Sequence, residues 1–257
     1  MGVLNVTPDS FADGGRFLDR GAALAHARRM AEEGADLVDV GAESTRPGAR
    51  AAAEDEELRR LMPVLEALAD FPIPVSVDTR RARVMREALA AGASMINDVQ
   101  ALQAPGALEA VAASDCAVSL MHMQGEPGTM QKNPHYGDVV QEVGAFLASR
   151  IRAAQAAGIA RERIALDPGF GFGKTQAHNL ELLRRLGELA AEGVPLLVGL
   201  SRKSMLGAIT GRPARDRLAA SVAAALLAAQ HGAKILRVHD IKETKDALAV
   251  WQALRAA

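Results

Sequence analysis

Eight short runs rich in Val, Ile and Leu recur along the chain and alternate with longer helical patterns. The predicted strands are residues 3–6, 37–40, 75–78, 95–98, 118–122, 164–167, 196–200 and 235–238. The predicted helices are about 21–33, 54–70, 82–91, 106–113, 139–157, 178–191, 215–231 and 241–254. Strands that alternate with helices indicate a parallel sheet built from βαβ units. Eight units favour a closed (β/α)₈ TIM barrel, although an open doubly wound sheet has the same local pattern.

The length of the chain agrees with one such barrel. It has 257 residues, and one (β/α)₈ barrel typically takes roughly 250. No low-complexity linker or break in composition divides the sequence. We therefore expect a single domain over residues 1–257.

Charge and cysteine content exclude several classes of protein. Thirty Lys and Arg against 31 Asp and Glu give a net charge of −1, so neither nucleic acid nor a membrane is expected as a partner. The single cysteine, Cys116, cannot form an intrachain disulfide, which fits a reducing compartment. We expect no secretory signal, because the first residues show neither a basic region nor a long apolar run. The nearly apolar run 218–229 is too short to span a bilayer. We expect a cytoplasmic location.

Three predicted loops are long and rich in Gly, Pro, Asp and Ser. Residues 7–20 and 41–53 follow the first two strands, and residues 123–137 follow the fifth. Long loops in a compact domain are usually functional or disordered. In a TIM barrel these loops lie at the C-terminal face of the strands, where active sites are found.

Polar side chains stand at or just beyond the end of every predicted strand. They are Asn5, residues 43–46, Asp78, Asn97, Asp98, His122, Asp167, residues 201–203, Arg237, His239 and Asp240. Any one of them could be a helix N-cap or a satisfied core group. Their recurrence at all eight strands instead favours one site at the mouth of the barrel.

The residue types in this set indicate a ligand. Asp78, Asn97 and Asp167 are short hydrogen-bonding groups that suit a flat heterocycle, and a carboxylate can accept two parallel N–H bonds from its edge. The cationic side chains nearby indicate a phosphate group, and they are Arg46, Arg202, Lys203, Arg237 and His239. Asn5 could add an oxygen ligand for Mg²⁺. The predicted ligand is a heterocycle that carries phosphate.

Two other sites are not supported. Residues 173–175 resemble the end of a P-loop, but Pro168 stands where that motif needs Gly, and Lys174 replaces the third Gly of G-x-G-x-x-G. We interpret the segment as a tight Gly-rich turn that presents Phe172 at the mouth. No His pair has metal-ligand spacing, and a nucleophile elbow is absent from the sequence.

The same segments resemble the dihydropteroate synthase family, in its order and spacing and over essentially the whole chain. The matching segments are residues 5–15, 43–48, 96–98, 167–174, 201–204 and 237–240. The resemblance implies a transferase that condenses 6-hydroxymethyl-7,8-dihydropterin pyrophosphate with p-aminobenzoate. Pyrophosphate would leave first by a dissociative step, and the arylamine would then attack to give 7,8-dihydropteroate. It also implies a folate-biosynthesis enzyme that is a target of sulfonamides, and a homodimer that forms through the last helices.

The resemblance further implies a role for each matching residue. The pterin ring would be bound by Asp78, Asn97, Asp167 and Lys203. The pyrophosphate would be bound by Asn5, Thr45, Arg46, Arg237 and His239, with Mg²⁺ as cofactor and Asn5 as its ligand. The p-aminobenzoate site would be lined by Phe11, Thr45, Pro47, Phe172, Ser201 and Lys203. The catalytic groups would be Asp13, Lys203, Arg237 and His239.

Two rival functions share part of this pattern. A methyltetrahydrofolate-dependent methyltransferase domain would also place Asp and Asn at strand ends, but it would not need residues 201–203 or the loop 7–15. A pterin-binding module without catalytic activity is the second rival. It finds no support in the sequence, because every catalytic position of the family pattern is filled.

Overall fold

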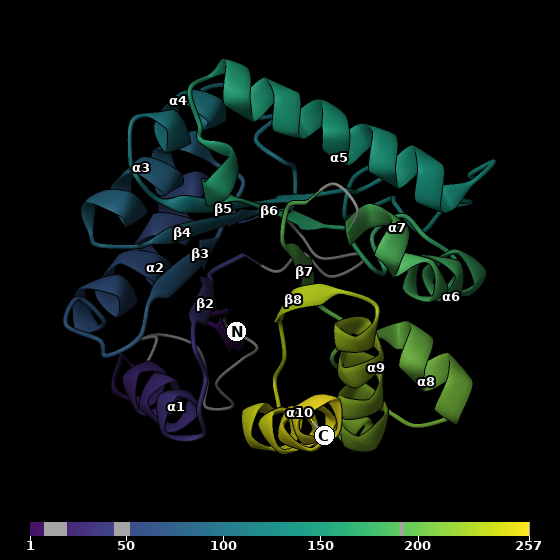
Figure 1. Cartoon of the computed structure of the whole chain (residues 1–257). Coiled ribbons are helices and arrows are strands. Elements are labelled where there is room, and N and C mark those ends of the chain that lie inside the picture. The colour runs from purple at the N-terminus through teal and green to yellow at the C-terminus, as the bar shows by residue number, and fades with distance from the viewer. Residues whose placement is uncertain (8–19, 44–51, 191–192, 257) are drawn as a thin grey trace.

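The eight predicted strands form one parallel sheet in the computed structural model, which describes residues 1–7, 20–43, 52–190 and 193–256 (Figure 1). The strands are β1 Gly2–Asn5, β2 Val38–Gly41, β3 Val75–Asp78, β4 Met95–Asp98, β5 Ala117–Met121, β6 Ile164–Asp167, β7 Leu196–Val198 and β8 Ala233–Leu236. They follow one another in chain order. A parallel bridge from Gly2 to Val238 closes the sheet, and the amide of Val3 donates to Val238 over 3.1 Å. The closed TIM barrel is confirmed, and the open doubly wound sheet is wrong.

Helices surround the ring of strands (Figure 1). They are α1 Arg20–Glu32, α2 Glu54–Ala67, α3 Ala82–Ala90, α4 Ala107–Ala112, α5 Val139–Ala156, α6 Gln176–Arg184, α7 Leu186–Ala190, α8 Ser204–Thr210, α9 Leu218–Gln230 and α10 Ile241–Ala256. Single 3₁₀ turns lie at Arg161–Arg163 and Ala214–Asp216. None of the helices in the described ranges is both long and apolar enough to cross a bilayer.

Three helical segments differ from the prediction. The predicted helix 178–191 is two helices, α6 and α7, and it starts earlier because the Thr175 hydroxyl caps α6 at the amide of His178. Leu182, Leu186 and Leu189 are buried on both sides of the break, so the apolar period could not reveal it. Helix α8 was not predicted, and the predicted start of α9 lies three residues too early, within a 3₁₀ turn.

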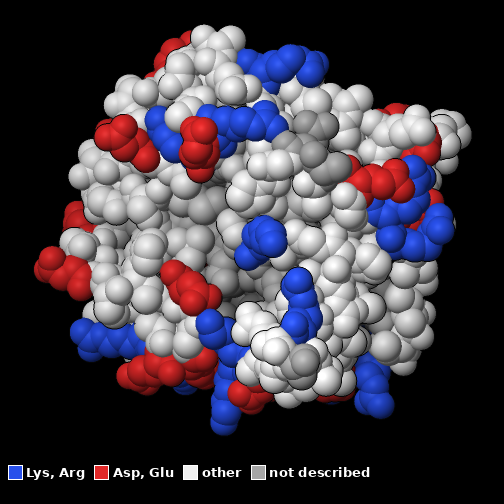
Figure 2. Space-filling view, viewed as in Figure 1, with Lys and Arg blue, Asp and Glu red and all other residues white. Residues whose placement is uncertain are grey.

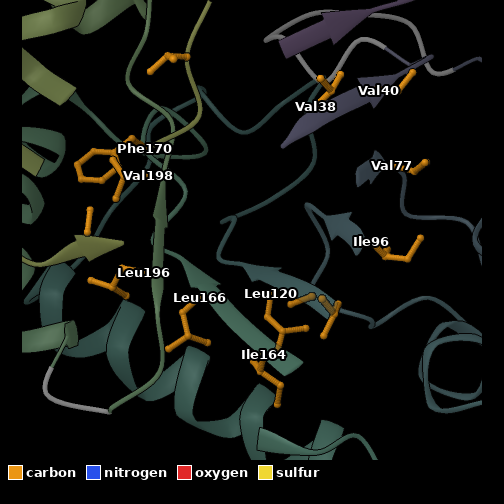
Figure 3. Close-up of a cluster of buried hydrophobic side chains, with 14 of the residues drawn as sticks. Val38, Val40, Val77, Ile96, Leu120, Ile164, Leu166, Phe170, Leu196 and Val198 are labelled. Carbon is orange, nitrogen blue, oxygen red and sulfur yellow. The ribbon is translucent and has the colours of Figure 1, made fainter. Parts of the chain in front are cut away.

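Two separate cores follow from the alternation of side chains along each strand. The outward-facing side chains pack under the helices, and Figure 3 shows them around the ring, among them Val40, Val77, Ile96 and Leu166. The inward-facing side chains fill the barrel itself. Its lower part is apolar and contains Met1, Met95, Ala165 and Leu197, with Leu37, Ala117 and Ile235 beside them. Such layers are the usual filling of a TIM barrel, so the polar side chains above them need another explanation.

Candidate active site at the mouth of the barrel

The ends of neighbouring strands place the predicted polar residues at the same height along the barrel axis. In the sheet register Asn5 lies beside Gly41, Gly41 beside Asp78, and Asp78 beside Asn97. Register partners on neighbouring parallel strands point to the same face, which here is the barrel interior. Figure 2 shows this end of the molecule hollowed at its centre, with Lys and Arg side chains next to the hollow.

Arg237 lies at the centre of an ionic network in the barrel. Its Nε donates to Oδ2 of Asp39 over 2.6 Å, and its Nη2 donates to Oδ2 of Asp78 over 3.1 Å. The amide Nδ2 of Asn97 donates to the same Oδ2 of Asp39 over 3.1 Å. The predicted pyrophosphate residue Arg237 and the predicted pterin residues Asp78 and Asn97 are thus linked directly or through one carboxylate.

Asp39 is not among the predicted site residues. This aspartate is fully buried, at 0% exposure, inside the apolar strand β2. The signal was present, because a charged residue within a short apolar strand calls for a buried partner. Its partner Arg237 lies 198 residues away, so the sequence could not identify it.

The carboxyl of Asp78 has a strongly perturbed acidity. Burial raises the pKa of Asp78 to about 7, against the lowering effect of the Arg237 guanidinium and with a further rise from Asp39. A carboxyl with a pKa this far from its usual value is typical of functional sites.

On the opposite side of the mouth, Lys203 lies close to Asp167 and two aromatic residues. Its Nζ donates to the carbonyl of Phe170 and lies 5.0 Å from the centroid of the half-buried Phe172 ring. Burial lowers the pKa of Lys203 to about 8, while the Asp167 carboxylate acts in the other direction. Oδ1 of Asp167 accepts from the amide of Gly169 over 2.7 Å. The predicted pterin residues Asp167 and Lys203 therefore lie beside Phe172, a predicted p-aminobenzoate residue.

Ser201 and His239 form a third pair at the mouth. Nδ1 of His239 lies 2.9 Å from Oγ of Ser201, and the backbone amide of His239 donates to the same oxygen over 3.3 Å. The neighbouring Arg202 is paired with Asp240 at 2.5 Å. Arg202 therefore has a carboxylate partner within the protein.

A buried lysine supports the turn after β6. Nζ of Lys174 lies 2.9 Å from Nδ1 of His122, and it donates to the carbonyls of Gly169 over 3.0 Å and Phe172 over 3.1 Å. We call these four residues the lysine–carbonyl cluster. Burial lowers the pKa of Lys174 to about 7 and that of His122 to about 3. The apparent P-loop lysine is thus an internal tie for a turn, in agreement with the rejection of the nucleotide motif.

Buried carboxylates support the rim beside β2 and β3. Arg81 pairs with the fully buried Glu57, contacts Glu43 at 3.2 Å, and donates to the carbonyl of Ala52. Arg80 pairs with Glu43 at 3.3 Å. We call Glu43, Glu57, Arg80 and Arg81 the acid–arginine cluster. Arg81 thereby joins α2 and α3 to the end of β2.

Several predicted site residues lie outside the described residues, namely Phe11, Asp13, Thr45, Arg46 and Pro47. Their roles stay predictions. Within the described ranges, no three His, Cys, Asp or Glu side chains are grouped so as to hold a metal ion. A site that relies on one amide ligand and on phosphate oxygens, as predicted for Asn5, is a different kind of site.

Comparison with known proteins identifies the family. The family model for the pterin binding enzyme matches residues 1–239. The chain is 52% identical over 254 residues to the dihydropteroate synthase of Haemophilus influenzae, with 98% of this chain and 92% of the relative covered. It superposes with a TM-score of 0.94 and 58% identity on a Xanthomonas albilineans dihydropteroate synthase with 4-aminobenzoic acid, covering 100% of this chain and 92% of that one.

A Yersinia pestis dihydropteroate synthase with a sulfonamide drug gives a TM-score of 0.95 at 52% identity, covering 100% of this chain and 94% of that one. These similarities extend over nearly the full length of both partners, so they favour the synthase over the methyltransferase. The chain belongs to the pterin binding enzymes and, among them, to the dihydropteroate synthase family.

Proposed function

We propose that the mouth of the barrel joins a dihydropterin pyrophosphate to p-aminobenzoate, to give 7,8-dihydropteroate and pyrophosphate. The observation that supports this most directly is that Arg237 and Asn97 share the carboxylate of Asp39. A group suited to phosphate thus lies next to a group suited to a heterocycle edge. The named relatives, one of them with 4-aminobenzoic acid, support the same reaction.

In this proposal the pterin ring lies between the two sides of the mouth. Asn97 and Asp167 are almost fully buried, at 5% and 7% exposure, so each has only a small accessible surface for hydrogen bonds to the ring. Asp78 and Lys203 complete the set. Short side chains on strands hold their positions well, which favours recognition of a rigid planar ligand.

The reaction then needs charge stabilisation rather than a strong base. The bond between the exocyclic methylene carbon and the pyrophosphate oxygen breaks, and its electron pair leaves with pyrophosphate. Arg237 and His239 would stabilise the charge on the leaving group. The amine nitrogen of p-aminobenzoate donates its lone pair to form the new C–N bond and releases one proton to solvent. Lys203 and Phe172 would position the arylamine, with Ser201 at the edge of its site.

The amide of Asn5 fits the proposed role as a Mg²⁺ ligand. An added Cβ at Gly41 would lie 3.7 Å from Oδ1 of Asn5 and 3.8 Å from Oδ2 of Asp78, so the glycine keeps space open between two oxygens. Mg²⁺ prefers oxygen donors and usually takes only one or two from the protein when phosphate is present. When bound, it would neutralise part of the pyrophosphate charge.

A homodimer through the last helices is also part of the proposal. Large apolar side chains on α9 and α10 are exposed, namely Leu218, Leu227, Val250 and Leu254. Apolar surface of this kind is common at protein interfaces. Sedimentation of the full chain would test the dimer. A cytoplasmic location is proposed as well, and the lone cysteine supports it.

The test is pyrophosphate release from the dihydropterin pyrophosphate with Mg²⁺, measured with and without p-aminobenzoate. We expect p-aminobenzoate to stimulate release and dihydropteroate to form in equal amount. Asp167→Asn should lower kcat/KM about 100-fold, because it removes a charged acceptor for the ring. The matched control is Asp55→Asn, which changes a side chain that is 84% exposed and should leave activity unchanged.

Two outcomes would contradict the proposal. Tight pterin binding without product would favour the silent binding module. Equal activity of Asp167→Asn and Asp55→Asn would reject the assignment of Asp167 to the pterin site.

A further inference from the structure

Asp39 occupies an unusual place beneath the predicted site. It is the charged residue of a four-residue strand whose members are all buried, and its side chain has no exposure. It therefore cannot touch a ligand at the mouth, unlike Asn97 and Arg237 above it. Any effect of Asp39 on the reaction must pass through its partners.

Only one of the two carboxylate oxygens of Asp39 accepts hydrogen bonds from the described residues. Oδ2 accepts from Nε of Arg237 over 2.6 Å and from Nδ2 of Asn97 over 3.1 Å. Oδ1 is buried and has no hydrogen-bond partner among the described residues. Leaving a buried carboxylate oxygen unpaired is unfavourable. The other oxygen of the carboxylate offsets this cost, because it serves two partners, the guanidinium of Arg237 and the amide of Asn97.

The shared oxygen fixes the distance between the guanidinium of Arg237 and the amide of Asn97. Arg237 follows β8 and Asn97 lies in β4, so the two side chains come from distant strands of the barrel. Both meet at a single acceptor atom, which sets the separation of the guanidinium from the amide. The bond that breaks in the proposed reaction joins the groups that these two side chains would bind, so their separation governs its alignment.

We propose that Asp39 is a positioning residue. It holds the side chains of Arg237 and Asn97 at a fixed separation and so couples the pyrophosphate subsite to the pterin subsite. This inference rests on the proposed function. The second bond of Arg237, to Asp78 at the mouth, involves a side chain that is 11% exposed and is itself a predicted ligand-binding group. Asp39 is therefore the anchor that a bound substrate cannot displace.

The experiment uses the full chain with Asp39→Ala and Asp39→Asn. The asparagine can keep its carbonyl oxygen as the acceptor for both bonds and place its amide where Oδ1 lies. The matched control is Ser76→Ala, which is the register partner of Asp39 on β3, equally buried, and without a partner for its hydroxyl among the described residues. Two probes are titrated separately, inorganic pyrophosphate with Mg²⁺ and 6-hydroxymethylpterin, and kcat and KM are measured alongside.

We expect Asp39→Ala to weaken both probes by about tenfold or more, the range for losing a hydrogen bond to a charged group. Asp39→Asn should recover much of this affinity, and Ser76→Ala should match the wild type. KM for the pterin substrate should rise and kcat should fall. A merely structural role would lower the melting temperature and leave both affinities unchanged.

Three results would overturn the proposal. One is wild-type affinity for both probes in folded Asp39→Ala. Another is tighter pyrophosphate binding, which would show that Asp39 acts only by opposing the charge of Arg237. If Asp39→Ala does not fold, Asp39→Leu takes its place, because leucine has nearly the shape of aspartate and accepts neither hydrogen bond. Wild-type affinity of Asp39→Leu for both probes then decides against the role. Failure of the proposed function differs from all of these, because the wild type itself would then form no dihydropteroate and release no pyrophosphate.

Discussion

The two sides of the mouth are each supported by a buried cation, but the two cations have different kinds of hydrogen-bond partner. In the acid–arginine cluster, Arg81 faces the carboxylates of Glu43 and Glu57. In the lysine–carbonyl cluster, Lys174 faces the neutral carbonyls of Gly169 and Phe172 and a histidine nitrogen. The first cluster joins side chains from three segments, whereas the second ties a turn largely to its own backbone.

This difference predicts different failures. Removal of one ion from a buried pair leaves the other without its partner, which is strongly destabilising. Lys174 donates its hydrogen bonds to neutral groups, and the Asp167 carboxylate acts on it through charge. Removal of this ammonium therefore leaves neutral acceptors unsatisfied, which is less costly for each group. The first cluster should therefore respond most to the loss of a charge. The second should respond most to a change in backbone shape, and next to pH.

The largest effect is expected from Gly169→Ala in the lysine–carbonyl cluster. Gly169 has φ +68°, and an added Cβ would lie 1.8 Å from the carbonyl oxygen of His122. We expect a loss of more than about 4 kcal/mol in the free energy of unfolding, or failure to fold. Gly211→Ala is the control, with φ +71° and open space, and should cost about 1–2 kcal/mol. The free energy of unfolding of both variants would be measured by denaturant titration. Equal losses in the two variants would contradict the role of the close approach at Gly169.

The next effect is expected from Arg81→Met in the acid–arginine cluster. The change leaves Glu57 fully buried without its guanidinium, and we expect a loss of about 3 kcal/mol. Adding Glu57→Gln to this variant should restore part of the stability, because the unpaired charge is removed. Arg83→Met, at an ion pair that is 51% and 84% exposed, should change stability by less than about 0.5 kcal/mol. Additive losses in the double variant would contradict charge pairing as the cause.

The smallest effect is expected from Lys174→Met, with a loss of about 2 kcal/mol at neutral pH. Its pH dependence is more informative. The pKa of Lys174 is about 7 in the folded chain and 10.5 for an ordinary lysine, the value expected in the unfolded chain. Between these two pH values the lysine is protonated in the unfolded chain and mostly neutral in the folded chain. The free energy of unfolding should therefore rise with pH across this window in the wild type, and rise less in the variant. Parallel stability curves for the two proteins would count against this pKa shift.

An exposed lysine provides the control for that measurement. Lys242 lies exposed on α10. Lys242→Met should keep the wild-type slope, because this change leaves the buried ammonium of Lys174 in place. A flattened slope in this control would mean that the slope reflects net charge rather than the buried ammonium.

Much of the fold could be predicted from the sequence because its signals are local. Strands β3, β4 and β6 have the predicted bounds, since each is a short buried run with a polar end. The position of the mouth also followed, because parallel strands end on one face. The break between α6 and α7 did not follow, because the apolar period continues across Arg185.

The site shows the same division. Its polar residues could be predicted from their places at strand ends, and the family from their spacing. Three partnerships could not be predicted: Arg237 with Asp39, Arg81 with Glu57, and Lys174 with His122. They join residues 198, 24 and 52 positions apart. Periodicity and capping act over a few residues, whereas the partner of a buried charge is chosen only when the barrel closes, and there the tertiary structure alone decides.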